Sequence, residues 1–418
     1  MAEADNDDGF ILPTDAFVEV LLRLPTSSRR RFRLVSKRWR DLINERTPER
    51  LVRTKILAFF SEAGASRAVV LADDDQQDGG DEQEWRFRSS CIDCRTYEYG
   101  AVVRLVGTCN GLLCLRDYLP LPCHRIGPTI AVVNPVTGEE SAAIPCPPES
   151  LSWDYHGGYR RVVEFSFGYH PTTGKYKVVR VSCTSEPPNK RLEIDSVQVL
   201  TLEGKSEWRA VPVPVLAMDT SYHDTGGVVT VDGSTYWLNA RADHVAALDL
   251  GDDDERVASF AAPPCLEVLQ VPTCQLTTVH GRLGVLVTRR QPAMTEAAKV
   301  NVWVLESGGG GGRRRPPPRW SRRWSILQPI AAWQGRWVMS PHFTHGEYVL
   351  SKQEENKAWS ARERCLYGRK VGDLASGSGK DAELWPLEGA EEIIMRTGDY
   401  DGGVVTFPYV ETTEPLPI

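Results

Sequence analysis

The segment of residues 10–50 constrains the fold most, because three short amphipathic helical patterns follow one another in it. In the first pattern, Phe17, Val20, Leu21 and Leu24 recur at the spacing of one helix face, and Pro25 ends the pattern. A unit of this size cannot bury so many apolar side chains by itself, so we expect it to bury the excess against a partner. The apolar residues of the second and third patterns are Phe32, Val35, Trp39, Leu42 and Ile43.

The same segment carries three short motifs in a fixed order. They read Leu-Pro-Thr-Asp over residues 12–15, Glu-Val-Leu-Leu-Arg-Leu-Pro over 19–25 and Arg-Phe-Arg-Leu-Val-Ser-Lys-Arg-Trp over 31–39. In this order the motifs resemble an F-box. The resemblance implies three helices that dock onto a Skp-type adaptor and, through it, onto the cullin and RING subunits of a ubiquitin ligase. The residues that it implies at or directly beneath the adaptor interface are Leu12, Pro13, Leu21, Leu22, Leu24, Pro25, Phe32, Val35 and Trp39.

The segment departs from the family pattern at three positions. Arg29 and Arg30 stand where relatives usually have two leucines, and Thr26 replaces a usual valine. These positions normally add apolar contact with the adaptor. We therefore expect the two arginines to lower the affinity for the adaptor.

Two other interpretations of residues 10–50 stay open. An ordinary helical subdomain packed on the rest of the chain is one, and a nucleic-acid-binding helix is the other, because basic residues outnumber acidic ones from Arg23 to Lys55. The net charge of the whole chain is −7, which argues against nucleic acid as the partner. The order of the motifs favours the F-box over the plain subdomain.

Composition predicts an intracellular protein with one small and one large domain in 418 residues. No run of about twenty apolar residues is present, so we expect no membrane span. Residues 1–9 are acidic, unlike a signal peptide, and are expected to be disordered. Ten cysteines with no framework spacing indicate reduced thiols, and hence a location in the cytoplasm, the nucleus or both.

After residue 50 the pattern changes from helical to β. Lys55–Phe60 and Ala68–Ala72 are expected as the first strands. Hairpins are expected around Asn110-Gly111, Asp232-Gly233 and His280-Gly281, since both central residues of a type I′ turn need positive φ. A fourth is expected over Phe165–Val181, around Pro171-Thr172-Thr173-Gly174, and longer two-stranded segments are expected over Ala131–Pro145, Val197–Pro212 and Val245–Pro263.

Paired hairpins give a four-stranded unit of about 40–50 residues, which is the period of a propeller blade. One such sheet cannot cover both of its faces, so successive copies stack around an axis. The sequence therefore predicts a small all-α F-box followed by an all-β domain, a degenerate β-propeller of six or, alternatively, seven blades.

This β region also resembles the F-box-associated domains of large plant F-box families, which have kelch-like β-propellers. The resemblance implies a domain over residues 51–412, a short tail over 413–418 and a substrate-binding role. The motifs that carry it are Gly107–Cys114, Asn134–Gly138, Phe167–His170, Asp232–Leu238 and Pro408–Thr412.

Three segments interrupt the β pattern and are expected as mobile loops: residues 73–84, 307–319 and 374–381. The second contains five glycines followed by arginines and prolines. Its arginines and the tryptophans after it are suited to an acidic or phosphorylated partner, although an insertion at a loop tip is the favoured explanation. The candidate substrate-binding residues are Arg313, Arg314, Arg315, Arg319, Trp320 and Trp324.

No catalytic motif is evident in the chain. The glycines at 308–312 lack the Lys-Ser/Thr of a phosphate-binding loop, and there is no Gly-x-Ser-x-Gly elbow. Cys91 and Cys94, followed by Cys109 and Cys114, suggest zinc, but small buried cysteines explain the second pair better. We therefore predict a non-catalytic substrate receptor with no metal or cofactor. The alternative is a propeller enzyme or small-ligand sensor, which ionisable groups lining the central channel would favour.

Overall fold

The computed structural model of this chain divides into two compact units, residues 1–53 with 171–174 and residues 54–170 with 175–418. The residues that the structure describes are 13–23, 32, 35, 39, 42, 55–61, 66–71, 83–87, 102–118, 128–147, 160–170, 173–185, 192–202, 207–212, 227–238, 244–251, 257–264, 273–279, 281–290, 297–306, 318–329, 337–338, 342–345, 348–358, 361–370, 383–384, 392–397, 404–413 and 416.

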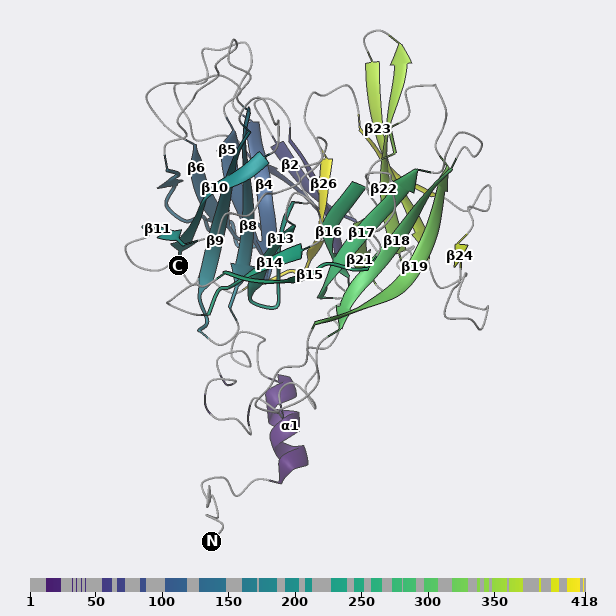
Figure 1. Cartoon of the computed structure of the whole chain (residues 1–418). Coiled ribbons are helices and arrows are strands. Elements are labelled where there is room, and N and C mark those ends of the chain that lie inside the picture. Colours follow the sequence, from purple (N-terminus) through teal and green to yellow (C-terminus); the bar gives the residue numbers. More distant parts are fainter. Residues whose placement is uncertain are drawn as a thin grey trace, which may run out of the picture. The chain divides into compact units, whose positions relative to one another are not determined.

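In the first unit, the described residues form the helix α1, Thr14–Arg23 (Figure 1). Pro13 precedes it, and the Phe17 amide donates a hydrogen bond to the Pro13 carbonyl at 3.0 Å. Asp15 lies in the first turn, where a carboxylate complements the helix dipole. The side chains of Phe17 and Leu21 are buried, and the half-buried side chains that pack on them are Phe32, Trp39 and Leu42.

The helix predicted for the first amphipathic pattern is therefore confirmed. The second and third patterns lie outside the described residues except at Phe32, Val35, Trp39 and Leu42. Trp39 presents a ring edge to both Phe17 and Phe32, with centroid distances of 4.5 and 5.2 Å. The third pattern thus contributes to the same small core, while the full three-helix arrangement stays a prediction.

The second unit is built almost entirely from β-strands (Figure 1). The first three sheets, each written from its innermost strand outward, are β26 (Val404–Tyr409), β1 (Lys55–Phe60), β2 (Ser66–Leu71) and β3 (Gln83–Phe87); β4 (Val102–Cys109), β5 (Leu112–Tyr118), β6 (Thr129–Val133) and β7 (Ile144–Pro145); and β8 (Arg160–Tyr169), β9 (Tyr176–Ser185), β10 (Leu192–Thr201) and β11 (Trp208–Val211).

The other described strands continue the same pattern, with antiparallel pairing except where β24 joins β19 in parallel. They are β12 (Val228–Val231), β13 (Ser234–Leu238), β14 (His244–Asp249) and β15 (Val257–Ala261); β16 (Thr273–Val279), β17 (Arg282–Arg290), β18 (Ala297–Glu306), β19 (Arg319–Pro329) and β24 (Glu383–Leu384); and β20 (Trp337–Val338), β21 (His342–His345), β22 (Tyr348–Ala358), β23 (Ala361–Lys370) and β25 (Glu392–Thr397).

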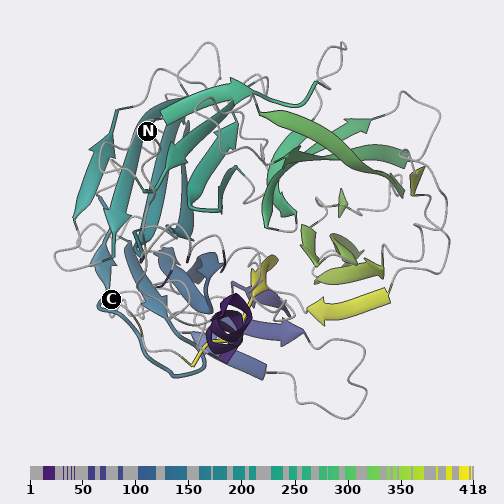
Figure 2. The same cartoon turned by 90° about the horizontal axis from the view of Figure 1, so that it is seen from below.

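These sheets follow one another around a common axis, which Figure 2 shows nearly end-on. The innermost strands of neighbouring sheets contact each other in the order β26, β4, β8, β12 and β16. β21 then contacts β16 on one side and both β1 and β26 on the other, so the succession of sheets closes into a ring. The predicted β-propeller is confirmed.

The predicted number of blades, six or alternatively seven, is not matched by the described blades. Five of the sheets are described with side chains packed as blades, and the sheet of strands β20–β25 is described through its backbone alone.

The short turn signals lie where the sequence predicted hairpins. Asn110 and Gly111, between β4 and β5, have φ angles of 53° and 82°. Asp232 and Gly233, between β12 and β13, have φ angles of 48° and 75°. Positive φ at both central residues is the requirement of a type I′ turn. The hairpin predicted over Phe165–Val181 is also confirmed as β8 and β9.

Hydrophobic cores lie between neighbouring sheets. The first sheet contributes Leu57 and Phe59 to a cluster with Leu113 and Leu115 of the second. The cluster between the second and third sheets includes Leu112 and Ile130 on one side and Val178 and Leu200 on the other. Adjacent residues of one strand therefore feed different clusters, as the period of two in a strand requires.

Two expected loops extend less far than predicted. The loop of residues 73–84 was wrong at its end, because Gln83 and Glu84 pair with Val70 and Val69 of β2. The loop of residues 307–319 was wrong at Arg319, which pairs with Glu306 as the first residue of β19. Residues 1–9, 374–381 and most of the other two loops lie outside the described residues. In the described part of the chain, no helix is long and apolar enough to cross a membrane.

Gly111→Ala should destabilise the protein much more than Gly138→Ala. Both glycines have positive φ, 82° and 73°, so each alanine carries about 1–2 kcal/mol of backbone strain. A Cβ at Gly111 would also overlap the Thr412 side chain and lie 2.7 Å from the Val410 carbonyl oxygen, whereas one at Gly138 meets nothing within 4 Å. We expect a loss of about 2–4 kcal/mol at Gly111 against about 1–2 kcal/mol at Gly138, measured by urea unfolding. Equal losses would mean that the C-terminal segment does not lie against this turn.

Candidate functional site

The exposed apolar side chains of the first unit are the first candidate site. Val20 on α1 is 49% exposed and Val35 is 59% exposed. In the described residues the only other large apolar side chain with comparable exposure is Val136 of the propeller, at 40%. These two side chains are candidates for contact with a partner.

The structure separates the predicted adaptor residues by exposure. Leu21 is completely buried in the core of its own unit, where it helps to hold α1 in place. Phe32 and Trp39 are half-buried, while Pro13 and Val35 are exposed. Leu22 lies in α1 with an undescribed side chain, and Leu12, Leu24 and Pro25 lie outside the described residues.

Val20 is exposed in the structure, whereas the sequence pattern predicted that it is buried. Its spacing from Phe17 and Leu24 placed it on the helix face that packs inward, yet almost half of it is exposed. A helix face of this width has edges, and periodicity does not tell which edge residue turns outward.

The second candidate site is the strand β19. Arg319, Arg322 and Arg323 are exposed, and Trp320 and Trp324 are half-buried. The pairing with β18 shifts by one residue at this point, because Val302 pairs with Trp324 and Trp303 pairs with Arg322. The extra residue is Arg323, and this bulge leaves two consecutive arginines exposed. Arg313, Arg314 and Arg315 lie outside the described residues.

Trp320 has a structural task that the sequence did not reveal. Its indole N–H donates to the carbonyl oxygen of Ala261, in β15 of the preceding sheet, at 2.9 Å. Its ring lies 6.3 Å from that of Phe260 in the same strand. Trp320 therefore joins two blades, and the prediction that it binds substrate has no support in this geometry.

The same device occurs two sheets earlier in the ring. Trp208, in β11, donates its indole N–H to the carbonyl oxygen of Pro145, in β7 of the preceding sheet, at 3.0 Å. In both cases an outer strand holds the outer strand of its neighbour. This recurrence identifies the tryptophans as part of the repeat.

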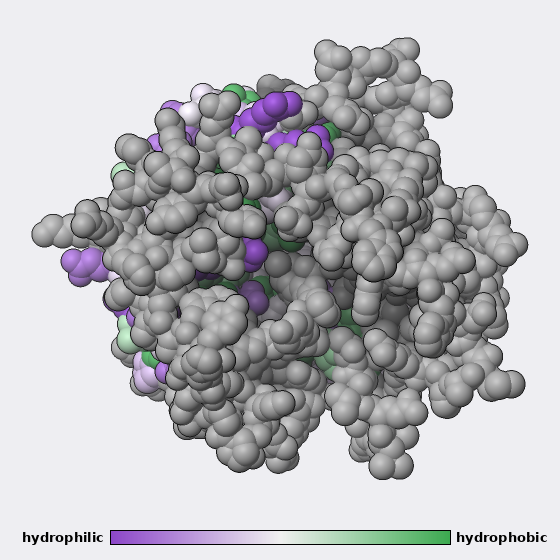
Figure 3. Space-filling model, turned by 90° about the horizontal axis from the view of Figure 1, so that it is seen from above, coloured by the Kyte–Doolittle hydropathy of each residue, from purple (hydrophilic) through white to green (hydrophobic). Residues whose placement is uncertain are grey.

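The third candidate is a cavity at the centre of the second unit, with a volume of about 210 Å³. Most of its walls come from the innermost strands β26, β4, β8, β12 and β16. Figure 3, which views the molecule from above, shows a hollow near the middle in which hydrophilic and hydrophobic residues are both visible. The lining includes Arg104, Arg116, Glu164, Ser166, Thr230, Gln275, Thr406 and Phe407.

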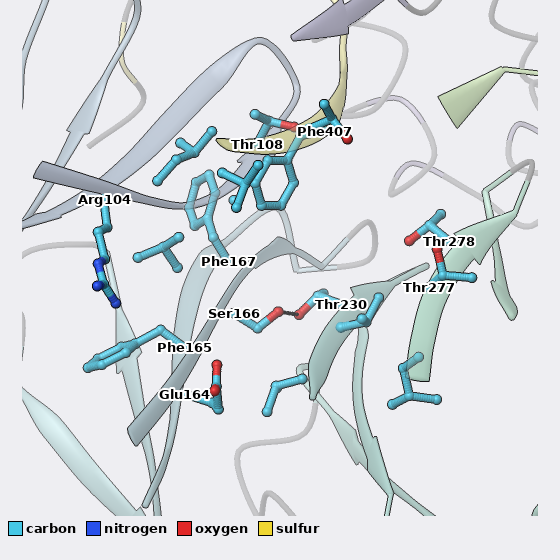
Figure 4. A pocket seen from close by; sticks show the side chains of 18 of the residues that line it. Arg104, Thr108, Glu164, Phe165, Ser166, Phe167, Thr230, Thr277, Thr278 and Phe407 are labelled. Carbon is cyan, nitrogen blue, oxygen red and sulfur yellow. Dashed lines mark hydrogen bonds between the residues drawn. The ribbon is translucent and has the colours of Figure 1, made fainter. Parts of the chain in front are cut away.

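Hydroxyl groups form a connected chain along one wall of this cavity. The Ser166 hydroxyl lies 2.6 Å from that of Thr230 (Figure 4). The Thr230 hydroxyl lies 2.8 Å from that of Thr235, which is not part of the lining. The close approach of β8 and β12 depends on Gly168, where a Cβ would overlap the Thr230 side chain. The hydroxyl of Thr108 donates to the Pro408 carbonyl at 2.6 Å on the wall between β4 and β26.

The ionisable groups among the described lining residues are Arg104, Arg116 and Glu164. In Figure 4, Arg104 lies on the same side of the cavity as Glu164 and Phe165, away from Thr277 and Thr278 of β16. Arg116 is opposite Arg104 in the β4–β5 pairing, and its guanidinium lies 4.3 Å from the Phe165 ring centroid. The β16 and β26 side of the cavity is lined by neutral residues in the described part of the chain.

Comparison with known protein families decides the identity of this chain. The model of the F-box associated beta propeller domain matches residues 56–358, and the model of the F-box domain matches residues 10–50. The chain belongs to the F-box-associated β-propeller family.

Relatives of this F-box protein cover most of its length. An Arabidopsis thaliana F-box/LRR-repeat protein is 27% identical over all of this chain and 85% of its own length. An F-box/kelch-repeat protein of the same plant is 25% identical, over 80% of this chain and 73% of its own. Among solved structures, the β-propeller domain of the Trilobed protease from Pyrococcus furiosus is similar over 83% of this chain and 93% of its own length, with 9% sequence identity and a TM-score of 0.32. This structural similarity is low.

Five cysteines of this F-box protein form no disulfide: Cys109, Cys114, Cys146, Cys183 and Cys274. Burial raises the pKa of Cys114, and the neighbouring Cys146 adds to the effect. Burial, with Asp195 and Glu164 adding, raises the pKa of Cys183 to about 12. Such thiols stay protonated and unreactive at neutral pH. Cys91 and Cys94 lie outside the described residues, within which no three metal-ligating groups cluster.

Trp320→Phe should lower the stability of this F-box protein, because phenylalanine keeps an aromatic ring beside Phe260 but cannot donate to Ala261. The loss of one such hydrogen bond reduces the free energy of unfolding by about 0.5–1.5 kcal/mol. Trp208→Phe is the matched variant and should lose a similar amount, since Pro145 is left without the same donor. Urea unfolding followed by circular dichroism measures both. If Trp320→Phe leaves stability unchanged while Trp208→Phe lowers it, Trp320 does not join the blades.

Proposed function

We propose that this chain is the substrate-recognition subunit of an SCF-type cullin–RING ubiquitin ligase, acting in the cytoplasm, the nucleus or both. The observation that carries the proposal is the joint match to an F-box over residues 10–50 and to the associated propeller over residues 56–358. Its contribution to ubiquitin transfer is proximity, since a receptor raises the effective concentration of substrate lysines near the charged enzyme without taking part in the chemistry. The subunit itself is non-catalytic.

The adaptor binds the exposed apolar surface of the F-box in this proposal. Val20 and Val35 lose contact with water in the complex, and each fully buried valine contributes roughly 1.5 kcal/mol or more. Leu21, Phe17 and Trp39 support that surface from inside. Leu12 and Pro13 open the motif, and we expect both to contact the adaptor.

Val20→Ala combined with Val35→Ala should weaken binding of a Skp-type adaptor roughly ten- to hundredfold. Each substitution removes two methyl groups from the interface, at about 0.8 kcal/mol for each group, and about 1.4 kcal/mol corresponds to a factor of ten. Isothermal titration calorimetry with the purified adaptor gives the dissociation constants. Val136→Ala is the matched control, because it truncates a similarly exposed valine in the propeller and should leave adaptor binding unchanged.

Two further variants complete this test. Leu12→Ala with Pro13→Ala should abolish co-purification of the adaptor while the propeller stays folded. Replacing Arg29 and Arg30 by leucine should tighten binding about tenfold, because apolar contact is restored. Adaptor affinity that is the same in all of these variants would show that the F-box of this chain is not its docking surface.

The substrate is held in part by the arginines of β19. Three exposed guanidinium groups on one strand suit an acidic or phosphorylated segment, since guanidinium forms paired hydrogen bonds with carboxylate and phosphate. Arg323 has a weak competitor within the chain, Glu306, at 4.0 Å. Three more arginines precede this strand in the sequence and add positive charge to this part of the chain: Arg313, Arg314 and Arg315.

Replacing Arg319, Arg322 and Arg323 by alanine should reduce capture of substrates several-fold at low ionic strength and less at high ionic strength, because salt screens exposed charges. The measurement is quantitative affinity capture under proteasome inhibition. Each variant is used as bait in a chain that lacks residues 10–50, so that the bait does not direct its substrate to degradation. The matched control replaces Arg86 and Arg282, which are exposed on β3 and β17. Capture that is equal in both variants at both salt concentrations would place the substrate site elsewhere on the propeller.

A further inference from the structure

On β16 and β26, two buried polar atoms of residues that line the central cavity have no hydrogen-bond partner in the described part of the protein. One is the hydroxyl oxygen of Thr406, in β26, whose residue is 7% exposed. The other is the side-chain carbonyl oxygen of Gln275, in β16. Both residues line the cavity. A buried polar group that lacks a partner destabilises the fold, so both atoms call for an explanation.

Hydroxyl groups on β4, β8 and β12 do have partners. Ser166 and Thr230 hydrogen-bond to each other, and Thr108 donates to the Pro408 carbonyl. The two unsatisfied atoms belong to β16 and β26, whose described lining residues are neutral. These two strands therefore have spare hydrogen-bonding capacity at the cavity.

Thr406 stands in a strand where an apolar residue would fit the pattern. Its neighbours are Val405 and Phe407, and valine has nearly the same shape as threonine. Replacing an unsatisfied buried hydroxyl by a methyl group of the same shape is neutral or stabilising. A hydroxyl at this position therefore weakens the empty protein, which is the usual mark of a residue kept for binding.

We propose that the central cavity binds a small uncharged molecule that carries hydroxyl or amide groups. The Gln275 oxygen only accepts, so the ligand must supply a donor, while the Thr406 hydroxyl both donates and accepts. The described lining on this side is neutral, and an ion without a counter-charge would be costly to bury there. Phe407, Leu276 and Val229 provide apolar surface for the carbon skeleton.

The size of the cavity limits the ligand further. Its 210 Å³ is below the roughly 300–1,000 Å³ of pockets that hold drug-sized molecules. A molecule as large as a monosaccharide or a short amide fits this bound. The inference goes beyond the proposed ligase role and does not depend on it. It corresponds to the small-ligand sensor that the sequence left open as an alternative.

The test is the ligand-induced shift of the unfolding temperature of the full chain, measured by differential scanning fluorimetry. The neutral probes are glucose, myo-inositol and acetamide at increasing millimolar concentrations, and the charged probes are glucuronate and glucosamine. The variants are Thr406→Val and Gln275→Met, which remove the two unsatisfied atoms. Thr129→Val is the matched control, since the Thr129 hydroxyl bonds to the Asp117 carboxylate at 3.1 Å outside the cavity.

We expect at least one neutral probe to raise the unfolding temperature in a saturable way in the wild type and in Thr129→Val. The shift should be lost in Thr406→Val and Gln275→Met. Without ligand, Thr406→Val should unfold at the same or a higher temperature than the wild type, and Thr129→Val at a lower one.

Three results would overturn the proposal. One is a shift of equal size in the wild type and Thr406→Val, which is the general effect of an excluded osmolyte. Another is that no neutral probe causes a saturable shift of the unfolding temperature, which would mean that the cavity holds only water. The last is a larger shift with a charged probe: with glucuronate it would assign the cavity to an anion held by Arg104 and Arg116, and with glucosamine to a cation.

Discussion

The pairing of β26 with β1 is the constraint on which the rest of the propeller depends. These strands lie at opposite ends of the β region, and their register runs from Lys55 opposite Tyr409 to Phe60 opposite Val404. Lys55 and Glu411, 356 positions apart in the chain, form a salt bridge of 2.7 Å beside it. The described apolar clusters lie between neighbouring sheets, so an open ring would expose apolar surface at the break. Closing so long a loop costs entropy that only the completed ring offsets.

Closure also sets the room available at different distances from the axis. Inner strands converge, and Gly168 in β8 allows the approach to β12 that brings Ser166 within 2.6 Å of Thr230. Outer strands diverge, and Trp208 and Trp320 span the wider gap with indole-to-carbonyl hydrogen bonds. The glycine at the inner contact and the tryptophans at the outer contacts are two consequences of one wedge-shaped geometry. The central cavity exists because the inner strands cannot converge completely.

Sequence reasoning succeeded where the physical cause is local. Asn110-Gly111 and Asp232-Gly233 predicted hairpins because positive φ is a property of those residues themselves. It failed where the cause lies far along the chain: the partner of Trp320 is 59 residues away, so an interblade hydrogen bond looked like a free aromatic side chain in a basic segment. The unsatisfied hydroxyl of Thr406 could not be foreseen either, because a strand threonine is ordinary until the other walls of its cavity are known.

The candidate surfaces differ in the physics by which each would select a partner. The F-box surface of Val20 and Val35 is apolar, and burial of apolar area is strong, tolerant of salt and poor at discrimination, which suits one constant partner. The arginines of β19 act through screened charge and respond to a partner's phosphorylation. The central cavity demands matched donors and acceptors, which is the most selective of the three, because any mismatch leaves Gln275 or Thr406 unsatisfied. In the proposed role, the F-box would keep the attachment to the ligase constant and the propeller would select the substrate.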